Sequence, residues 1–212
     1  MKTDELVVAL ARQAGPVERR PAARLAIGAA LGAVAAVPVL LWQLGMNPSL
    51  AADARTPMFW VKLAFVASIA AVGWWLVRCV AQPGAQPRRA LRALTVPLIG
   101  MVLLAVAVLV TAPAEQRTAL LMGSSWKSCP LNIAMLAAPA LVLLLATVHS
   151  LAPTRLRLAG AGVGLLAGAI GALVYTVHCP EFAAPFLVVW YVLGMLIPAV
   201  VGAVIGPRVL RW

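Results

Sequence analysis

The sequence predicts an all-α membrane protein with six transmembrane helices and a short amphipathic helix near its N-terminus. Of its 212 residues, 63% are hydrophobic and only 11% are charged, whereas a soluble domain carries roughly a quarter charged residues. Six apolar stretches each approach the length of about 20 residues that a helix needs to cross a bilayer. They cover Leu25–Leu44, Trp60–Val80, Ala93–Ala112, Leu131–Ser150, Leu158–Val177 and Pro185–Ile205.

These stretches divide the chain into two parts. Residues 1–24 form a soluble, partner-binding segment, and residues 25–212 form a six-helix transmembrane domain that leaves no room for a separate catalytic domain. A cleaved signal peptide would have a short basic lead and an apolar core of about 7–15 residues. The longer, partly acidic lead therefore favours a first span that is retained.

The N-terminal segment predicts a short helix with one apolar face. Asp4 and Glu5 lie where carboxylates favour the start of a helix. Leu6, Val7 and Leu10 follow at helical spacing. Such a short helix is marginal alone and becomes ordered when its apolar face docks in a groove. We expect these five residues to bind a protein partner; a helix lying on the membrane surface is the alternative.

Basic residues orient the spans. Positive side chains collect on the cytoplasmic side of membrane proteins. With the N-terminus inside, thirteen Lys and Arg residues fall in cytoplasmic segments and four fall outside. Both termini are therefore expected on the cytoplasmic side of the membrane, with outer loops near residues 45–59, 113–130 and 178–184. The net charge of +11 is explained by this orientation, so we expect no direct binding to nucleic acid.

Glycine spacing predicts close packing of the fifth span. Gly160, Gly164 and Gly168 repeat every four residues, and Gly202 and Gly206 repeat at the same interval in the sixth span. Small residues at this spacing let helix backbones approach closely. Packing within the bundle is the first expectation, and a homodimer is the alternative.

The sequence offers little to an enzyme or a transporter. Transporters carry ionisable groups inside their spans, but Lys62 lies near an expected membrane boundary, where its amine can reach water. The chain has no CxxC pair, glycine-rich phosphate loop or HExxH motif. A catalytic serine is only weakly indicated: His178 is a conceivable base for Ser124 or Ser125 across the outer loops. We expect no enzymatic activity and no required cofactor.

Two cysteines carry the remaining chemistry. Cys129 ends the second outer loop and Cys179 opens the third, so both are expected at the same depth outside the membrane. A disulfide is the default there, and it would act simply as a staple. Together with His178 the two sulfurs also offer a soft site for a thiophilic metal, to which Glu181 adds an oxygen. Lys127 and His178 are candidates for lowering a thiol pKa.

Several segments together resemble the NrsF family of negative regulators of sigma F, which are bacterial inner-membrane anti-sigma factors. The resemblance runs along the whole chain. Its specific motifs are WKSCPLN at residues 126–132 and HCPE at residues 178–181, accompanied by MKTDEL at residues 1–6 and APTR at residues 152–155.

This resemblance implies a function that the residues alone do not specify. It implies that the N-terminal segment sequesters an extracytoplasmic-function (ECF) sigma factor. It also implies that Cys129 and Cys179 sense heavy-metal or oxidative stress and release that factor. A membrane thiol-disulfide oxidoreductase and a metal transporter remain the alternatives.

Overall fold

The computed structural model describes residue 3, residues 21–82 and residues 86–211 of the chain. This part is helical and contains no strand, as the sequence predicts. Its longer helices are α2 (Pro21–Gln43), α4 (Pro57–Ala81), α6 (Thr95–Thr111), α8 (Cys129–His149), α9 (Leu156–Tyr175) and α11 (Val192–Val209). Shorter helical segments are α3 (Leu50–Asp53), α5 (Arg88–Ala93), α7 (Ala114–Met122), α10 (Ala184–Phe186) and the π-helix η1 (Leu187–Tyr191).

The six predicted spans are confirmed within the described residues. Six helical stretches there are long and apolar enough to cross a membrane. The third joins α5 to α6 over Arg88–Thr111, and the sixth joins α10, η1 and α11 over Ala184–Val209. The second outer loop differs from its prediction because α7 occupies part of it.

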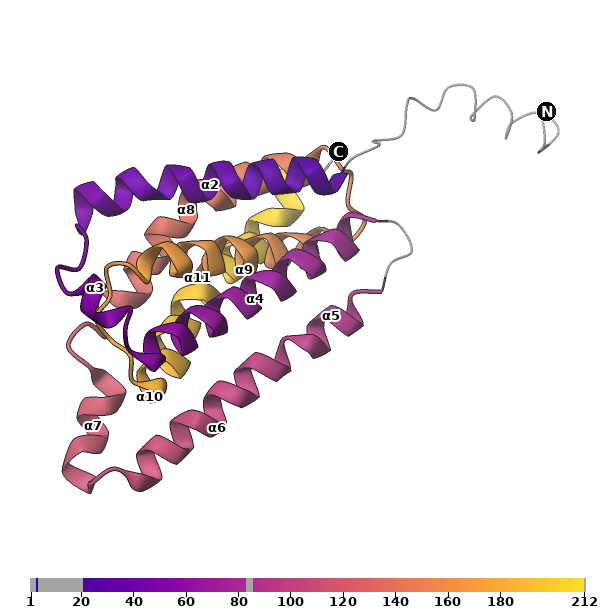
Figure 1. Ribbon diagram of the computed structural model, residues 1–212. Helices are drawn as coiled ribbons and strands as arrows, with labels where there is room; N and C mark the ends of the chain where they lie inside the picture. Colours follow the sequence, from indigo (N-terminus) through magenta and orange to yellow (C-terminus); the bar gives the residue numbers. More distant parts are fainter. Residues whose placement is uncertain (1–2, 4–20, 83–85, 212) are drawn as a thin grey trace.

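Helix α9 lies at the centre of the bundle (Figure 1). Helices α4, α8 and α11 pack against it, and α2 packs on both α8 and α9. In the most apolar window of α9, 72% of the residues are buried, against 11% for the span formed by α5 and α6. That third span lies along the edge of the bundle and leaves most of its surface for lipid (Figure 1).

The predicted glycine packing joins α9 to α11 inside the chain. A side chain at Gly160 would collide with the backbone oxygen of Gly202, and one at Gly164 would collide with that of Pro198. Gly168 faces Met195 of α11 at similarly close range. Backbones can approach this closely only where no Cβ intervenes. The glycine-lined face of α9 is therefore covered by α11 of the same chain.

We predict that Gly160→Ala destabilises the bundle, because the added methyl group would push α9 away from α11. Overpacking of this kind costs about 1–3 kcal/mol. Gly100→Ala is a matched control because nothing lies within 4 Å of its Cβ position, so the helix-favouring alanine should be neutral or stabilising. Thermal unfolding of both variants in the same detergent checks this. Equal melting temperatures would contradict the packing account.

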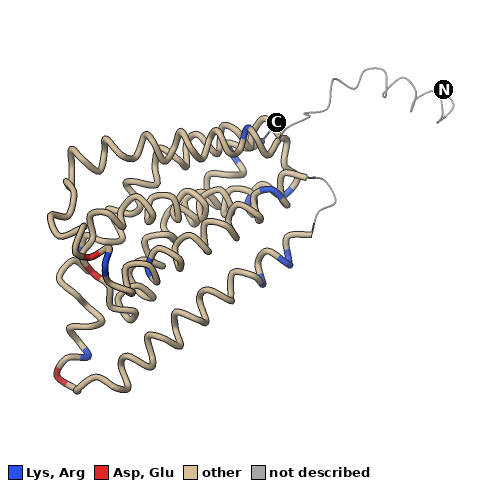
Figure 2. The backbone as a smooth tube through the Cα atoms, in the orientation of Figure 1, with Lys and Arg blue, Asp and Glu red and all other residues tan. Residues whose placement is uncertain are grey.

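Charge divides the two ends of the bundle. The N-terminal end of α2 and the C-terminal end of α11 lie together, at the same end as the C-terminus of α4 and the start of α5 (Figure 1). Among the described residues, most Lys and Arg lie at this end, and the Asp and Glu residues lie at the other (Figure 2). The arrangement agrees with the expected alternation of the loops, and we refer to the two as the arginine-rich end and the thiol end.

Candidate functional site: a buried thiol pair

The two cysteines meet at the thiol end. Cys129 is the first residue of α8, and Cys179 lies in the connection that follows α9. Both are free thiols, and the Cys129 thiol donates a hydrogen bond to the Cys179 sulfur. Their predicted proximity is confirmed. Both sulfurs are enclosed by protein, because Cys129 is 0% and Cys179 only 1% exposed.

Lys62 of α4 is the residue that the sequence interpretation missed. It is 0% exposed, so it does not reach water as expected. Its Nζ donates hydrogen bonds to the backbone oxygens of Cys179 at 2.8 Å and Glu181 at 3.1 Å. Helix α4 begins at Pro57 and not at Trp60. Lys62 therefore lies within the span, against the connection that carries Cys179.

Two kinds of group around Lys62 can interact with an ammonium group. Besides the two carbonyl oxygens, its Nζ lies 5.0 Å from the Phe182 ring centre and 4.8 Å from that of Tyr191. Carbonyl oxygens and aromatic faces both stabilise an ammonium group. A buried charge is nevertheless costly unless it has a partner of opposite sign. The anion best placed to be that partner is the thiolate of Cys179.

Glu181 is used elsewhere and ties two outer loops together. Its carboxylate accepts hydrogen bonds from the backbone N–H of Ser124 at 2.6 Å and the Ser124 hydroxyl at 2.7 Å. Gly123 makes this contact possible: it has a φ of +55°, and a Cβ there would lie 2.7 Å from the carboxyl carbon. Ser124 therefore pairs with Glu181, and the weakly expected serine–histidine catalytic group does not form.

His178 is engaged by the first outer loop. Its Nδ1 lies 3.0 Å from the backbone oxygen of Gly45, and Asn47 N–H donates to the Val177 carbonyl at 3.2 Å. The first and second outer loops therefore both hold the segment that carries Cys179. In the described part of the chain, no group of three or more His, Cys, Asp and Glu residues is arranged to hold a metal ion. The two sulfurs offer a soft ion two ligands, and the Nδ1 of His178 cannot supply a third while it is paired with Gly45.

Aromatic groups close the site on the membrane side. The ring centres of Tyr175 and Tyr191 lie 5.9 Å apart with the rings tilted by 41°, and Asn132 donates to the Tyr175 hydroxyl at 3.4 Å. Tyr191 ends the π-helix η1, a distortion that often occurs at functional sites. The indole N–H of Trp190 in η1 donates to the Leu121 carbonyl of α7 at 2.9 Å. The thiols are therefore enclosed between η1, α8 and the outer loops.

The two sulfurs are chemically unequal. The pKa of Cys179 is lowered to about 5, first because Cys129 donates a hydrogen bond to its sulfur, and further by the Lys62 ammonium and the Tyr191 hydroxyl; burial opposes these effects. Lys127 and His178, the two residues considered from the sequence, are not among the main causes of this shift. Lys127 is exposed and lies over the Trp126 ring. Cys179 is therefore the more nucleophilic sulfur, with Cys129 positioned to react next.

The expected partner-binding residues Asp4, Glu5, Leu6, Val7 and Leu10 lie outside the described residues. The third cysteine, Cys79, is half-buried near the C-terminal end of α4. It therefore lies at the arginine-rich end, far along the helix from Lys62, and provides a natural reference thiol for experiments.

The fold and the site together define a six-span membrane protein that encloses a paired thiol centre at one end. The profile of the family described as NrsF, negative regulator of sigma F, matches residues 10–212. The chain belongs to this family.

Two curated relatives match along their whole length and that of this chain. The "Probable anti-sigma-F factor NrsF" of Azospira oryzae is 46% identical over 213 residues. The "Anti-sigma-F factor NrsF" of Caulobacter vibrioides is 38% identical over 214 residues. No solved structure matches the chain significantly.

Proposed function

We propose that this protein is an inner-membrane anti-sigma factor that holds an ECF-type sigma factor through its N-terminal segment. The observation that carries the proposal is full-length similarity to two proteins named as anti-sigma-F factors. The apolar stripe of Leu6, Val7 and Leu10 would cover a surface of the sigma factor that RNA polymerase needs. Inhibition then requires only occlusion, and the protein acts without catalysis.

The cytoplasmic placement of that segment is part of the proposal. The segment precedes α2, whose first residue lies at the arginine-rich end (Figures 1 and 2). Under the positive-inside rule this end faces the cytoplasm, where a sigma factor is found. The thiol end then faces the periplasm, where oxidants and metal ions arrive first.

The stress signal in this scheme is a reaction of Cys129 and Cys179 with an oxidant or a thiophilic metal ion. Either would join the start of α8 to the loop between α9 and α10. An oxidant would first convert the Cys179 thiolate to a sulfenic acid. The Cys129 thiol would then attack that sulfur, releasing water and forming a disulfide. A soft metal ion would instead bind both sulfurs as thiolates.

The packing of α2 on α8 supplies a route between the two ends. A Cβ at Gly32 of α2 would lie 2.5 Å from the Ala140 Cα of α8, and one at Gly28 would lie 2.9 Å from the Thr147 hydroxyl oxygen. A displacement of α8 at Cys129 would therefore be felt by α2 and by the N-terminal segment that precedes it. A ligand or reaction shifts such an equilibrium by its differential free energy, and a few kcal/mol suffice.

The proposal predicts that Leu6→Ala with Leu10→Ala releases the sigma factor without stress. Removing two apolar anchors should weaken the complex at least about tenfold. Arg12→Gln is the control, because residue 12 falls on the opposite face at helical spacing. Co-purification of sigma factors with the full-length variants, read by mass spectrometry, provides the measurement. Undiminished sigma binding by the leucine variant would contradict the proposed docking helix.

A further inference from the structure

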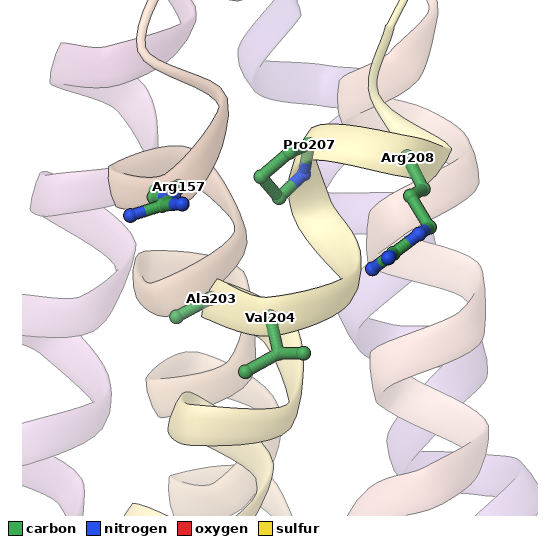
Figure 3. A pocket seen from close by; sticks show the side chains of 5 residues that line it. All are labelled: Arg157, Ala203, Val204, Pro207 and Arg208. Carbon is green, nitrogen blue, oxygen red and sulfur yellow. The ribbon is translucent and has the colours of Figure 1, made fainter.

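A large pocket lies at the arginine-rich end, away from the thiols. It has a volume of about 620 Å³ and opens between the N-terminal end of α9 and the C-terminal end of α11. Figure 3 shows Arg157 on one helix and Arg208 on the other, with Pro207 between them in this view. Arg157, Ala203, Val204, Pro207 and Arg208 line it.

Close helix packing brings the two arginines to the same pocket. A Cβ at Gly206 would lie 2.7 Å from the Leu156 backbone oxygen and 3.2 Å from the Gly160 Cα. The ends of α9 and α11 therefore meet at Leu156 and Gly206. Leu156 directly precedes Arg157, and Gly206 lies two residues before Arg208. Arg157 and Arg208, which belong to two different helices, therefore line the same pocket.

The pocket is basic and carries no compensating acid. Arg157 and Arg208 are exposed, and neither has a hydrogen-bond or ion-pair partner among the residues that the structure describes. No acidic residue of the described part of the chain lines the pocket. Guanidinium groups bind phosphate through paired, charge-assisted hydrogen bonds. The polar part of the pocket therefore fits a phosphate group.

The apolar part continues along α11 toward the middle of the span. Leu193, Leu196, Val200 and Val204 are 42%, 46%, 60% and 59% exposed, and their spacing places them along one face of the helix. This exposed strip runs from the pocket into the region expected to lie among lipid chains. Phosphate-binding groups above an apolar strip match the two halves of a phospholipid.

We propose that Arg157 and Arg208 bind the phosphate of an anionic phospholipid, whose acyl chain lies along the exposed face of α11. Basic pockets between transmembrane helices on the cytoplasmic side suit such headgroups. A soluble phosphate would not use the apolar strip, and an acidic protein segment would not continue into the membrane. The bound lipid would hold together the inner ends of the fifth and sixth spans. The outer ends of the same two spans flank the connection that carries Cys179.

The test compares two pairs of neutralised arginines in the full-length protein. Arg157→Gln with Arg208→Gln removes the proposed site. Arg89→Gln with Arg92→Gln removes the same charge from exposed positions of α5 at the same end. Each protein, purified in mild detergent, is titrated with phosphatidylglycerol or phosphatidylcholine, and retained lipid is counted by native mass spectrometry.

We expect the first pair to weaken phosphatidylglycerol binding about tenfold or more, and the control pair to stay within about twofold of the parent. Phosphatidylcholine binding should be unchanged in both. Equal losses in the two pairs would assign the effect to general surface charge and overturn the proposal. Glycerol 1-phosphate competing as well as the lipid would also overturn it, by showing a site for phosphate alone.

Discussion

Replacing Cys129 and Cys179 together with serine should abolish stress-induced release of the sigma factor and leave the unstressed complex intact. Serine is of similar size and can take part in the hydrogen bond between the two positions, but it neither forms a disulfide nor binds soft metal ions. The N-terminal segment and the α2–α8 contact are unchanged. A reporter driven by the partner sigma factor should therefore stay at its repressed level after peroxide or metal treatment.

The comparison thiol is Cys79, which lies at the arginine-rich end of α4. Cys79→Ser should respond like the parent. Each single change at the thiol end should also abolish the response, because both the disulfide and the bridging metal need two sulfurs. Normal induction in the double variant would refute sensing by the pair.

The second large effect concerns Lys62→Met, which should make Cys179 react like an ordinary thiol. The pKa of Cys179 is lowered to about 5, and the Lys62 ammonium contributes to this shift. Removing a nearby opposite charge typically moves the pKa of an ionisable group by about 1–3 units. The half-maximal pH for alkylation of Cys179 should therefore rise by about that amount. Rates measured by mass spectrometry, in a Cys79→Ser background, check the shift.

Lys127→Met is the matched control for this experiment. It removes the same charge from an exposed side chain near Cys129 in the sequence and should leave the profile unchanged. Lys62→Gln separates charge from positioning, since an amide still donates hydrogen bonds to carbonyl oxygens. It should behave like the methionine variant. If Lys62→Gln matches the parent, Lys62 acts only by holding the loop.

The ionised Cys179 also links stability to pH. Its pKa is lowered in the folded protein from an ordinary value near 9.0 to about 5. The unfolded chain therefore binds more protons between these values, and the free energy of unfolding should rise with pH across this window. This contribution is fully present above about pH 9 and is lost as the pH falls through about 5. Lys62→Met should flatten the rise, which melting temperatures from pH 5 to 9 would reveal.

Much of the architecture could be predicted because apolar length and glycine spacing are local properties. The six spans and the α9–α11 packing follow directly from them. The meeting of Cys129 with Cys179 also followed, since both border neighbouring spans on one side. Helix α7 was missed because its sequence is polar and short, so the region appeared to be an ordinary loop.

The interior of the site could not be predicted because it depends on contacts between distant segments. Lys62 looked like a boundary residue until the structure placed the Cys179 and Glu181 carbonyls over it. Glu181 and His178 looked like metal ligands, yet their partners are Ser124 and the Gly45 backbone, each from a different loop. Periodicity in one sequence carries no information about such pairings.

The most direct test of the account is the affinity of the full-length protein for its sigma factor before and after the thiol pair is oxidised. The protein is held in nanodiscs, oxidised with peroxide, and the Cys129–Cys179 disulfide is verified by mass spectrometry. The account predicts that the Kd rises at least about tenfold, and that the double serine variant shows no change. An unchanged Kd in fully oxidised protein would contradict the proposed link between the two ends of the bundle.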